Sequence, residues 1–246
     1  MNAPLTASLM GGAIAAGFMA LLGLPAFFRG RALMALFAIS LSFADEFIQA
    51  WGAFGGISLI HGSWNWDGKL FDLAFLLLVA VVLVASGVFS REDLGLTWKQ
   101  RPGTLRAVFI VVAVIVVIDF TFIHFAPHES FAAEDLAFQL TMPGFTEELF
   151  YRGLLLAVFD RMFQPRVTLL GAKLGYGAIV TSLAFGFVHA FSVSRALHVT
   201  FSPVLAVGPL ISGFFTAWFR ARSGSLVLPI LGHNLSNTMV TVAQAW

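Results

Sequence analysis

The chain has 246 residues, of which 59% are hydrophobic and 11% are charged, and its mean hydropathy is +0.88. Soluble domains carry about 25% charged residues, so this composition indicates a polytopic membrane protein and excludes an ordinary soluble domain. The net charge of +1 gives no reason to expect a nucleic-acid partner, and the absence of cysteine excludes disulfides and thiolate metal sites.

Eight stretches of the sequence are apolar over about 20 residues, the length needed to cross a bilayer as a helix. In chain order they cover roughly residues 6–28, 32–60, 70–90, 104–126, 140–163, 174–194, 197–219 and 225–245. The first has no basic segment ahead of it, so we interpret it as a span rather than a cleaved signal. The sequence therefore predicts an all-α polytopic membrane protein with about eight transmembrane helices around a polar cavity.

Two stretches fit this pattern less well. Asp45 and Glu46 interrupt the second span, and we expect the chain to break there at a membrane interface rather than to carry function. The segment 127–140 mixes apolar and acidic residues, and we expect it to lie along the interface before the fifth span.

Charged residues in the loops predict the orientation. Alternate loops share 11 of the 14 basic residues, namely Arg29, Arg31, Arg91, Lys99, Arg101, Arg106, Arg161, Arg166, Lys173, Arg220 and Arg222. The loops of the other side hold Lys69 and Arg195, together with the acidic residues Glu129, Glu134 and Asp135. The positive-inside rule then places the basic loops in the cytoplasm and both termini outside the cytoplasmic (inner) membrane.

The fifth stretch contains Glu147, Glu148 and Arg152 within an otherwise apolar run. Ionisable groups are costly in hydrocarbon, so such residues point to function by default. On a helix Glu148 and Arg152 share a face, whereas Glu147 lies roughly 100° away from Glu148. We expect Glu148 to pair with Arg152 and Glu147 to be left for chemistry; the alternative is an ion pair with a spare carboxylate that snorkels.

The residues just before these glutamates suggest where their helix begins. Pro143-Gly144 is expected to break the helix, which leaves Thr146 as a possible N-cap. The partial positive charge of a helix N-terminus would then point at Glu147 and Glu148.

Two later spans contain histidines at a depth similar to that of Glu147. His189 lies in the sixth span, and His233 and Asn237 share one helical face in the eighth. Glu147 could take a proton from water held by His189, while His233 and Asn237 could donate hydrogen bonds to an oxyanion. A lone membrane histidine more often bonds to a neighbouring helix, but two at matched depth with a glutamate favour a catalytic site.

The same side chains leave a metal site open as an alternative. Glu147, His189 and His233 match the two histidines and one glutamate of a common zinc site. No H-E-x-x-H helix is present, so this interpretation depends on composition alone.

Three motifs thus occur in order, each in a separate predicted helix: Glu147-Glu148-x-x-x-Arg152, Phe185-x-x-x-His189 and His233-x-x-x-Asn237. Together they resemble the motif set of the CPBP (or ABI) family, the CAAX proteases and bacteriocin-processing or immunity membrane proteins, which include the type II CAAX prenyl endopeptidases. The resemblance covers roughly residues 104–242. The first three spans carry nothing distinctive.

The resemblance implies an intramembrane endopeptidase of eight helices with its site open toward the cytoplasm. Residues 1–103 would supply N-terminal helices and residues 104–246 the catalytic core of one integral membrane domain. Glu147 would be the general base and His189 its partner in activating water. His233 and Asn237 would form the oxyanion pocket, and the ion pair of Glu148 with Arg152 would support the site. The family has been described both as metal-dependent and as a metal-free glutamate protease; we favour the second, because an asparagine donor makes a metal unnecessary.

The substrate expected from this resemblance is a membrane-anchored peptide or protein, lipidated or carrying a leader peptide. Some family members act in immunity or as scaffolds, so a non-catalytic protein that binds a partner in the same cavity is the alternative. A catalytic cavity should have open space for water near Glu147, whereas a scaffold should be packed shut. A secondary transporter is a more distant alternative, because no two halves of the sequence correspond. The sequence leaves the oligomeric state open.

Overall fold

The computed structural model describes residues 3–56, 58–123 and 130–244. Its first helices are α1 (Ala3–Phe27), α2 (Ala32–Ala53), α3 (Trp66–Ala85), α4 (Thr104–Ile123) and α5 (Ala133–Gln139). A continuous rod follows, made of α6 (Met142–Glu148), the π-helix η1 (Leu149–Leu155) and α7 (Leu156–Met162). The last elements are the hairpin β1 (Val167–Leu169) and β2 (Ala172–Leu174), α8 (Tyr176–Ala190), the hairpin β3 (Phe191–Val193) and β4 (Val199–Phe201), α9 (Pro203–Ser223) and α10 (Val227–Ala243).

The helices overlap the stretches expected from the sequence, although α3 begins before its predicted range and α9 ends after its own. Four of them, α1, α2, α3 and α9, are each long and apolar enough to cross a membrane. Shorter apolar helices lie in α4 and α8, and the fifth stretch forms the rod α6–η1–α7. The protein is therefore a mostly helical integral membrane protein, and the number of helices that cross the bilayer stays a prediction.

Two short hairpins depart from the all-α expectation. In β1–β2, Leu170 and Gly171 form a two-residue turn in which both have positive φ (47° and 81°), the geometry that suits a tight hairpin. The hairpin β3–β4 replaces the end of the sixth predicted span and the start of the seventh. The seventh helix is consequently displaced toward the C-terminus, and it ends at Gly224, whose φ of +79° closes the helix as a left-handed C-cap.

The loops that carry the basic residues are joined to one another at one end of the helices. Arg31, between α1 and α2, donates to the Arg161 carbonyl at the end of α7 (2.7 Å). Arg101, between α3 and α4, donates to the Ala221 carbonyl of α9 (2.7 Å), and Arg220 donates back to the backbone of the same α3–α4 loop. These contacts agree with the expectation that the basic loops share one side.

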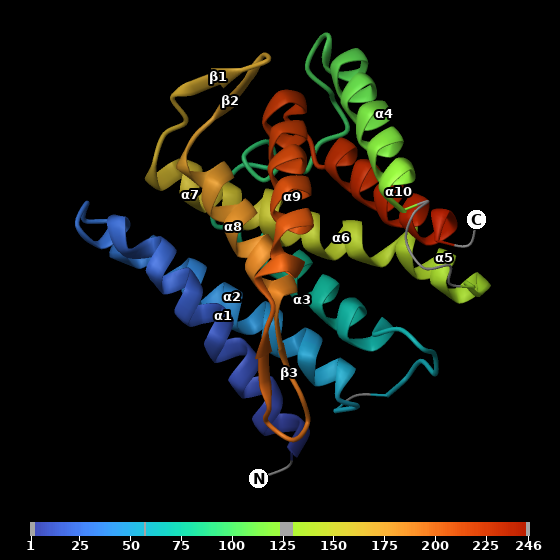
Figure 1. Cartoon of the computed structure of the whole chain (residues 1–246). Coiled ribbons are helices and arrows are strands. Elements are labelled where there is room, and N and C mark those ends of the chain that lie inside the picture. Colours follow the sequence, from blue (N-terminus) through green and yellow to red (C-terminus); the bar gives the residue numbers. More distant parts are fainter. Residues whose placement is uncertain (1–2, 57, 124–129, 245–246) are drawn as a thin grey trace.

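The opposite end brings together α5, the α2–α3 loop and the β3–β4 hairpin. Glu134 of α5 accepts hydrogen bonds from Ser63 N and Oγ (2.9 and 3.0 Å) and Trp66 Nε1 (3.0 Å), while Arg195 donates to the Phe54 carbonyl (2.9 Å). Helix α1 begins beside β3, and α10 ends beside α5 (Figure 1). Glu129, which the sequence groups with the acids of this end, lies outside the described residues.

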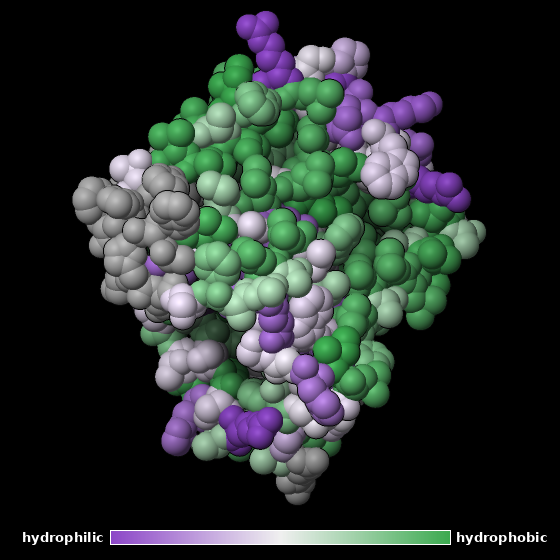
Figure 2. All heavy atoms as spheres, turned by 90° about the vertical axis from the view of Figure 1, so that its right-hand side faces the viewer, coloured by the Kyte–Doolittle hydropathy of each residue, from purple (hydrophilic) through white to green (hydrophobic). Residues whose placement is uncertain are grey.

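The outer surface of the molecule is largely apolar. Figure 2 shows hydrophobic side chains over most of the middle of one face, with the strongly polar side chains mainly at its top and bottom. Large residues such as Phe109, Val204 and Leu78 are more than half exposed. In a soluble protein such a surface would cause aggregation, whereas a bilayer about 30 Å thick covers it.

Candidate active site

The glutamates lie at the end of α6, more than one turn after the α6–η1–α7 rod begins. Helix α6 starts at Met142 with Pro143 in its first turn, where a missing N–H costs nothing. Thr146 is inside this helix and its Oγ1 donates to the Met142 carbonyl (2.9 Å), so the prediction that Thr146 caps the helix was wrong. The proline supports the helix start instead of breaking it.

Asn234 of α10, which the sequence did not single out, holds the start of this helix. Its Oδ1 accepts the Gly144 N–H (2.7 Å), a donor that a helix start leaves free, and its Nδ2 donates to the Thr141 carbonyl (3.3 Å), which also accepts the Phe145 N–H. A Cβ on Gly144 would lie 2.4 Å from Asn234 Oδ1 and 2.8 Å from the Ile230 carbonyl. Glycine at 144 therefore permits the close contact between α6 and α10 that sets the depth of the glutamates.

Glu148 is fully buried and is held from two sides. Its Oε2 lies 3.3 Å from Arg152 Nε, and its Oε1 lies 2.7 Å from His233 Nδ1. The expected ion pair between Glu148 and Arg152 is thus present. Because a carboxylate accepts hydrogen bonds, His233 carries a proton on Nδ1 and directs Nε2 away from Glu148.

Arg152 lies in η1 and shows what the phenylalanine of the second motif does. Its guanidinium carbon is 4.7 Å from the centre of the Phe185 ring, and Nη2 donates to the Gly213 carbonyl of α9 (2.9 Å). The same ring meets His233 edge-on at 5.7 Å. A buried cation over an aromatic face is stabilised by the ring quadrupole, and π-helical turns often occur at functional sites.

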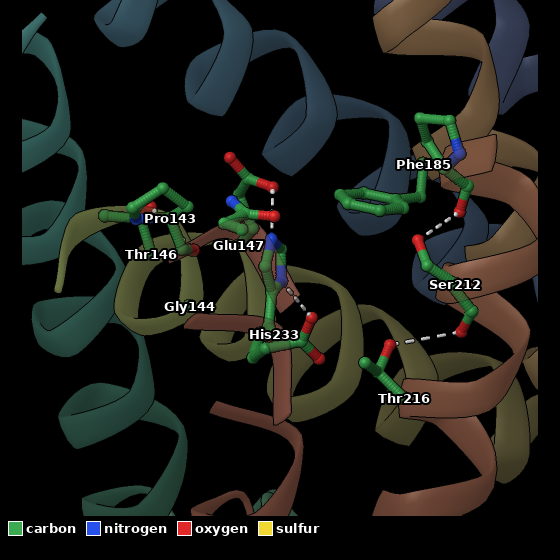
Figure 3. A network of polar contacts seen from close by, with 12 residues as sticks. Pro143, Gly144, Thr146, Glu147, Phe185, Ser212, Thr216 and His233 are labelled. Carbon is green, nitrogen blue, oxygen red and sulfur yellow. Dashed lines mark hydrogen bonds and ion pairs between the residues drawn. The ribbon is translucent and has the colours of Figure 1, made fainter. Parts of the chain in front are cut away.

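Glu147 has a charged partner of its own, contrary to expectation. Its Oε1 lies 2.7 Å from Lys69 Nζ of α3. Its Oε2 lies 3.7 Å from His233 Nε2, and Figure 3 shows these two side chains facing each other. The sequence placed Lys69 in an external loop, but α3 begins at Trp66 and buries this side chain. His233 therefore lies between the two glutamates, and Lys69 closes the other side of Glu147.

The predicted site residues line one cavity. It has a volume of about 910 Å³, and its walls include Glu147, His189, His233 and Asn237. His189 Nδ1 lies 2.7 Å from the Phe185 carbonyl, so this nitrogen is the donor and Nε2 is free to accept. Asn237 Nδ2 donates to Gln139 Oε1 (3.0 Å), a partner in α5 that the sequence analysis missed.

Acidic residues of α2 and α3 lie behind Lys69. Asp45 and Asp72 are 5% and 0% exposed and both interact electrostatically with Lys69. The expectation that Asp45 marks a break of the second span was wrong, because α2 continues to Ala53. Lys69 and Asp72 are three residues apart and so share a helical face. This spacing was the signal in the sequence that could have placed Lys69 in a helix.

The donors of the zinc alternative do not form a metal site. Over the ranges that the structure describes, no three His, Asp or Glu side chains are grouped closely enough to hold a metal ion. His233 and Glu147 bind Glu148 and Lys69 through Nδ1 and Oε1, and their other polar atoms, Nε2 and Oε2, lie 3.7 Å apart.

Comparison with known protein families gives a match to this region. The family model for type II CAAX prenyl endopeptidases of the Rce1-like kind matches residues 104–239, more than half of the chain. The chain belongs to this family. No curated protein and no solved structure matched.

The match to the CAAX prenyl endopeptidase family contains every motif residue that surrounds the cavity, from Glu147 to Asn237. It begins at the first residue of α4 and so omits α1, α2 and α3. Lys69, Asp45 and Asp72 therefore reach the site from helices outside the matched region.

Proposed function

We propose that this CAAX endopeptidase family member is an intramembrane endopeptidase in which Glu147 activates water for attack on a peptide bond. One observation carries the proposal. Glu147 lies on the wall of a 910 Å³ cavity shared with both histidines, and its buried Oε2 accepts no hydrogen bond from the described residues. A general base needs this combination of an available oxygen and adjacent space for water.

In the proposed reaction Glu147 Oε2 takes a proton from water as the water oxygen bonds to the substrate carbonyl carbon. The carbonyl oxygen becomes the oxyanion of a tetrahedral intermediate. The protonated Glu147 then gives its proton to the departing nitrogen as the C–N bond breaks. The products are a new carboxylate and a new amine, and Glu147 returns to its starting form.

His189 suits the role of holding the attacking water. Since Nδ1 donates to the Phe185 carbonyl, Nε2 of the neutral ring accepts, and a water in the cavity can donate one proton to His189 and the other to Glu147. This arrangement supports the expected partnership of His189 with the base.

Asn237 and His233 are the proposed oxyanion pocket. One N–H of the Asn237 amide donates to Gln139 in the free protein, and the second N–H of the same amide can donate to the oxyanion. For this role His233 must be the imidazolium, with Nδ1–H donating to Glu148 and Nε2–H directed into the cavity beside Glu147. Glu148 and Arg152 act by positioning His233 rather than by contacting the substrate.

We propose that this chemistry needs no metal ion. The proposal is supported by the spacing of the candidate ligands, because within the described ranges no three His, Asp or Glu side chains are grouped for a metal ion. Glutamate, histidine and asparagine together supply the base and the oxyanion donors.

The substrate that we propose is a membrane-anchored peptide or protein with a lipid-like part. An apolar groove of about 430 Å³ runs between α4 and α10 and shares Val112 and Gly232 with the large cavity. Its other walls are Leu105, Val108, Phe109, Leu228, Leu231 and Leu235, with Arg106 as the one charged residue. A hydrocarbon chain seated there would leave the attached peptide beside the catalytic residues.

The alternative of a non-catalytic scaffold is less well supported. A scaffold should fill the space next to Glu147 with side chains or with a partner's segment. The open volume in front of Glu147 favours hydrolysis.

The test is to incubate the purified protein with a membrane proteome and to label newly formed amino termini. We expect new termini with the wild-type protein and none with Glu147→Gln. Equal labelling by the two proteins, or none by either, would contradict the proposal.

A further inference from the structure

Lys69 is the cation that pairs with Glu147, and it comes from outside the matched family region. Its Nζ lies 2.7 Å from Glu147 Oε1, and the Lys69 side chain is only 10% exposed. Among the described residues that line the large cavity, it is the only lysine or arginine. An ion pair this short and this shielded restricts both side chains.

Lys69 is itself held from behind. Asp72, three residues further along α3, and Asp45 of α2 both attract it. Asp45 and Asp72 also interact with each other, so the two carboxyl groups lie together on this side of Lys69. Buried carboxylates are unfavourable without a neighbouring cation, so these aspartates fix the ammonium between themselves and Glu147.

The position of this ammonium decides which oxygen of Glu147 faces the reaction space. Lys69 occupies Oε1, so Oε2 is the oxygen left near His233. A second cavity of about 160 Å³, lined by Asp45, Glu46 and Gln49, adjoins Lys69 and Glu147 on the side of α2. Glu147 and Lys69 line both cavities, so loss of the ammonium would remove the ion pair that fixes the Glu147 carboxylate between them.

We propose that Lys69 is a positioning residue for hydrolysis, which holds Glu147 in the orientation that presents Oε2 to water. The inference rests on the proposed function and extends it to the helices before residue 104. It assigns to α2 and α3 a part in catalysis, because they place and anchor the cation that orients the base.

The test compares Lys69→Met, Lys69→Arg and the control Lys173→Met, which removes an exposed cation from β2. Since a displacement of about 1 Å can cost about 10²-fold in rate, Lys69→Met should lower kcat by about 10- to 100-fold. KM should stay within about twofold, because orientation of the base matters mainly in the transition state. Lys69→Arg should recover part of kcat, and Lys173→Met should cleave like the wild type.

A thermal-melting cycle with Lys69→Met, Glu147→Gln and the double variant measures the ion pair without any need for activity. We expect the double variant to lose less stability than the two single losses added together, as coupled partners do. Additive losses, or a Lys69→Met variant with unchanged or higher kcat, would overturn the inference while leaving the proposed function standing. A wild-type protein that cleaves nothing would instead refute the proposed function on which the inference rests.

Discussion

The two regions of the chain contribute to the site in different ways. In residues 104–246 Glu148 finds its cation, Arg152, four positions away on the same rod. Glu147 finds its cation, Lys69, in residues 1–103 on a separate helix. A local pair follows from helix geometry alone, whereas the pair between helices depends on how α3 packs against α6. The family motifs therefore include His233, one neighbour of the base Glu147, but not Lys69, the cation that pairs with it.

The largest change in stability should come from the local pair. Glu148→Gln leaves the buried Arg152 without its carboxylate, and breaking a buried pair from one side costs about 3–5 kcal/mol. Melting temperature in detergent should fall, and Arg152→Gln should behave in the same way. The double variant should lose less than the two single losses added together. A Glu148→Gln protein that melts like the wild type would show that the local Glu148–Arg152 pair does not stabilise the fold.

A smaller loss is expected where α6 meets α10. Gly144→Ala would place a Cβ 2.4 Å from Asn234 Oδ1, so the two helices must separate. Overpacking of this kind costs about 1–3 kcal/mol. Gly208→Ala is the matched control, because a Cβ at that helical glycine meets nothing within 4 Å. Equal melting of the two variants would contradict the close contact.

The contact between α5 and the α2–α3 loop joins the two regions and should respond to acid. The hydrogen bond from Trp66 Nε1, with those from Ser63, lowers the pKa of Glu134 below its usual 4.5. A lowered pKa stabilises the fold above the unfolded value, and this contribution is lost as pH falls through the folded value. Glu134→Gln should therefore remove part of the loss of melting temperature seen below about pH 4.5. If the melting temperature of Glu134→Gln depends on pH in the same way as that of the wild type, Glu134 does not stabilise the contact between α5 and the α2–α3 loop.

The smallest effect should appear at the apolar groove. Val112→Phe would narrow the connection between the groove and the large cavity, and it should raise KM for a lipidated peptide several-fold. The same peptide without its lipid should be cleaved by both proteins with similar kcat/KM. If both peptides are affected equally, the groove does not seat the lipid.

The sequence predicted much of the fold because apolar length and helical spacing are local properties. The approximate helix positions, the Glu148–Arg152 pair and the shared cavity of Glu147, His189, His233 and Asn237 are as expected. The hairpins were missed because their short apolar strands resemble parts of membrane helices.

The partner of Glu147 was missed for a different reason. Lys69 was assigned to a loop because the third helix was expected to begin at residue 70, and a shift of four residues moved it into the protein. Its contact with Glu147 depends on the packing of α3 against α6, which hydrophobic pattern does not specify. Asn234 and Gln139 were missed because an isolated amide gives no signal before its partner helix is placed.

The central claim is that Glu147 does the chemistry while its neighbour Glu148 holds the structure. The most direct measurement is the single-turnover cleavage rate of Glu147→Gln, corrected for the folded fraction from its melting curve. Glutamine keeps the shape and can still accept from Lys69, so the variant should stay folded while its rate falls by about 10²–10⁴-fold or more. A folded Glu147→Gln protein that cleaves at the wild-type rate would contradict the account.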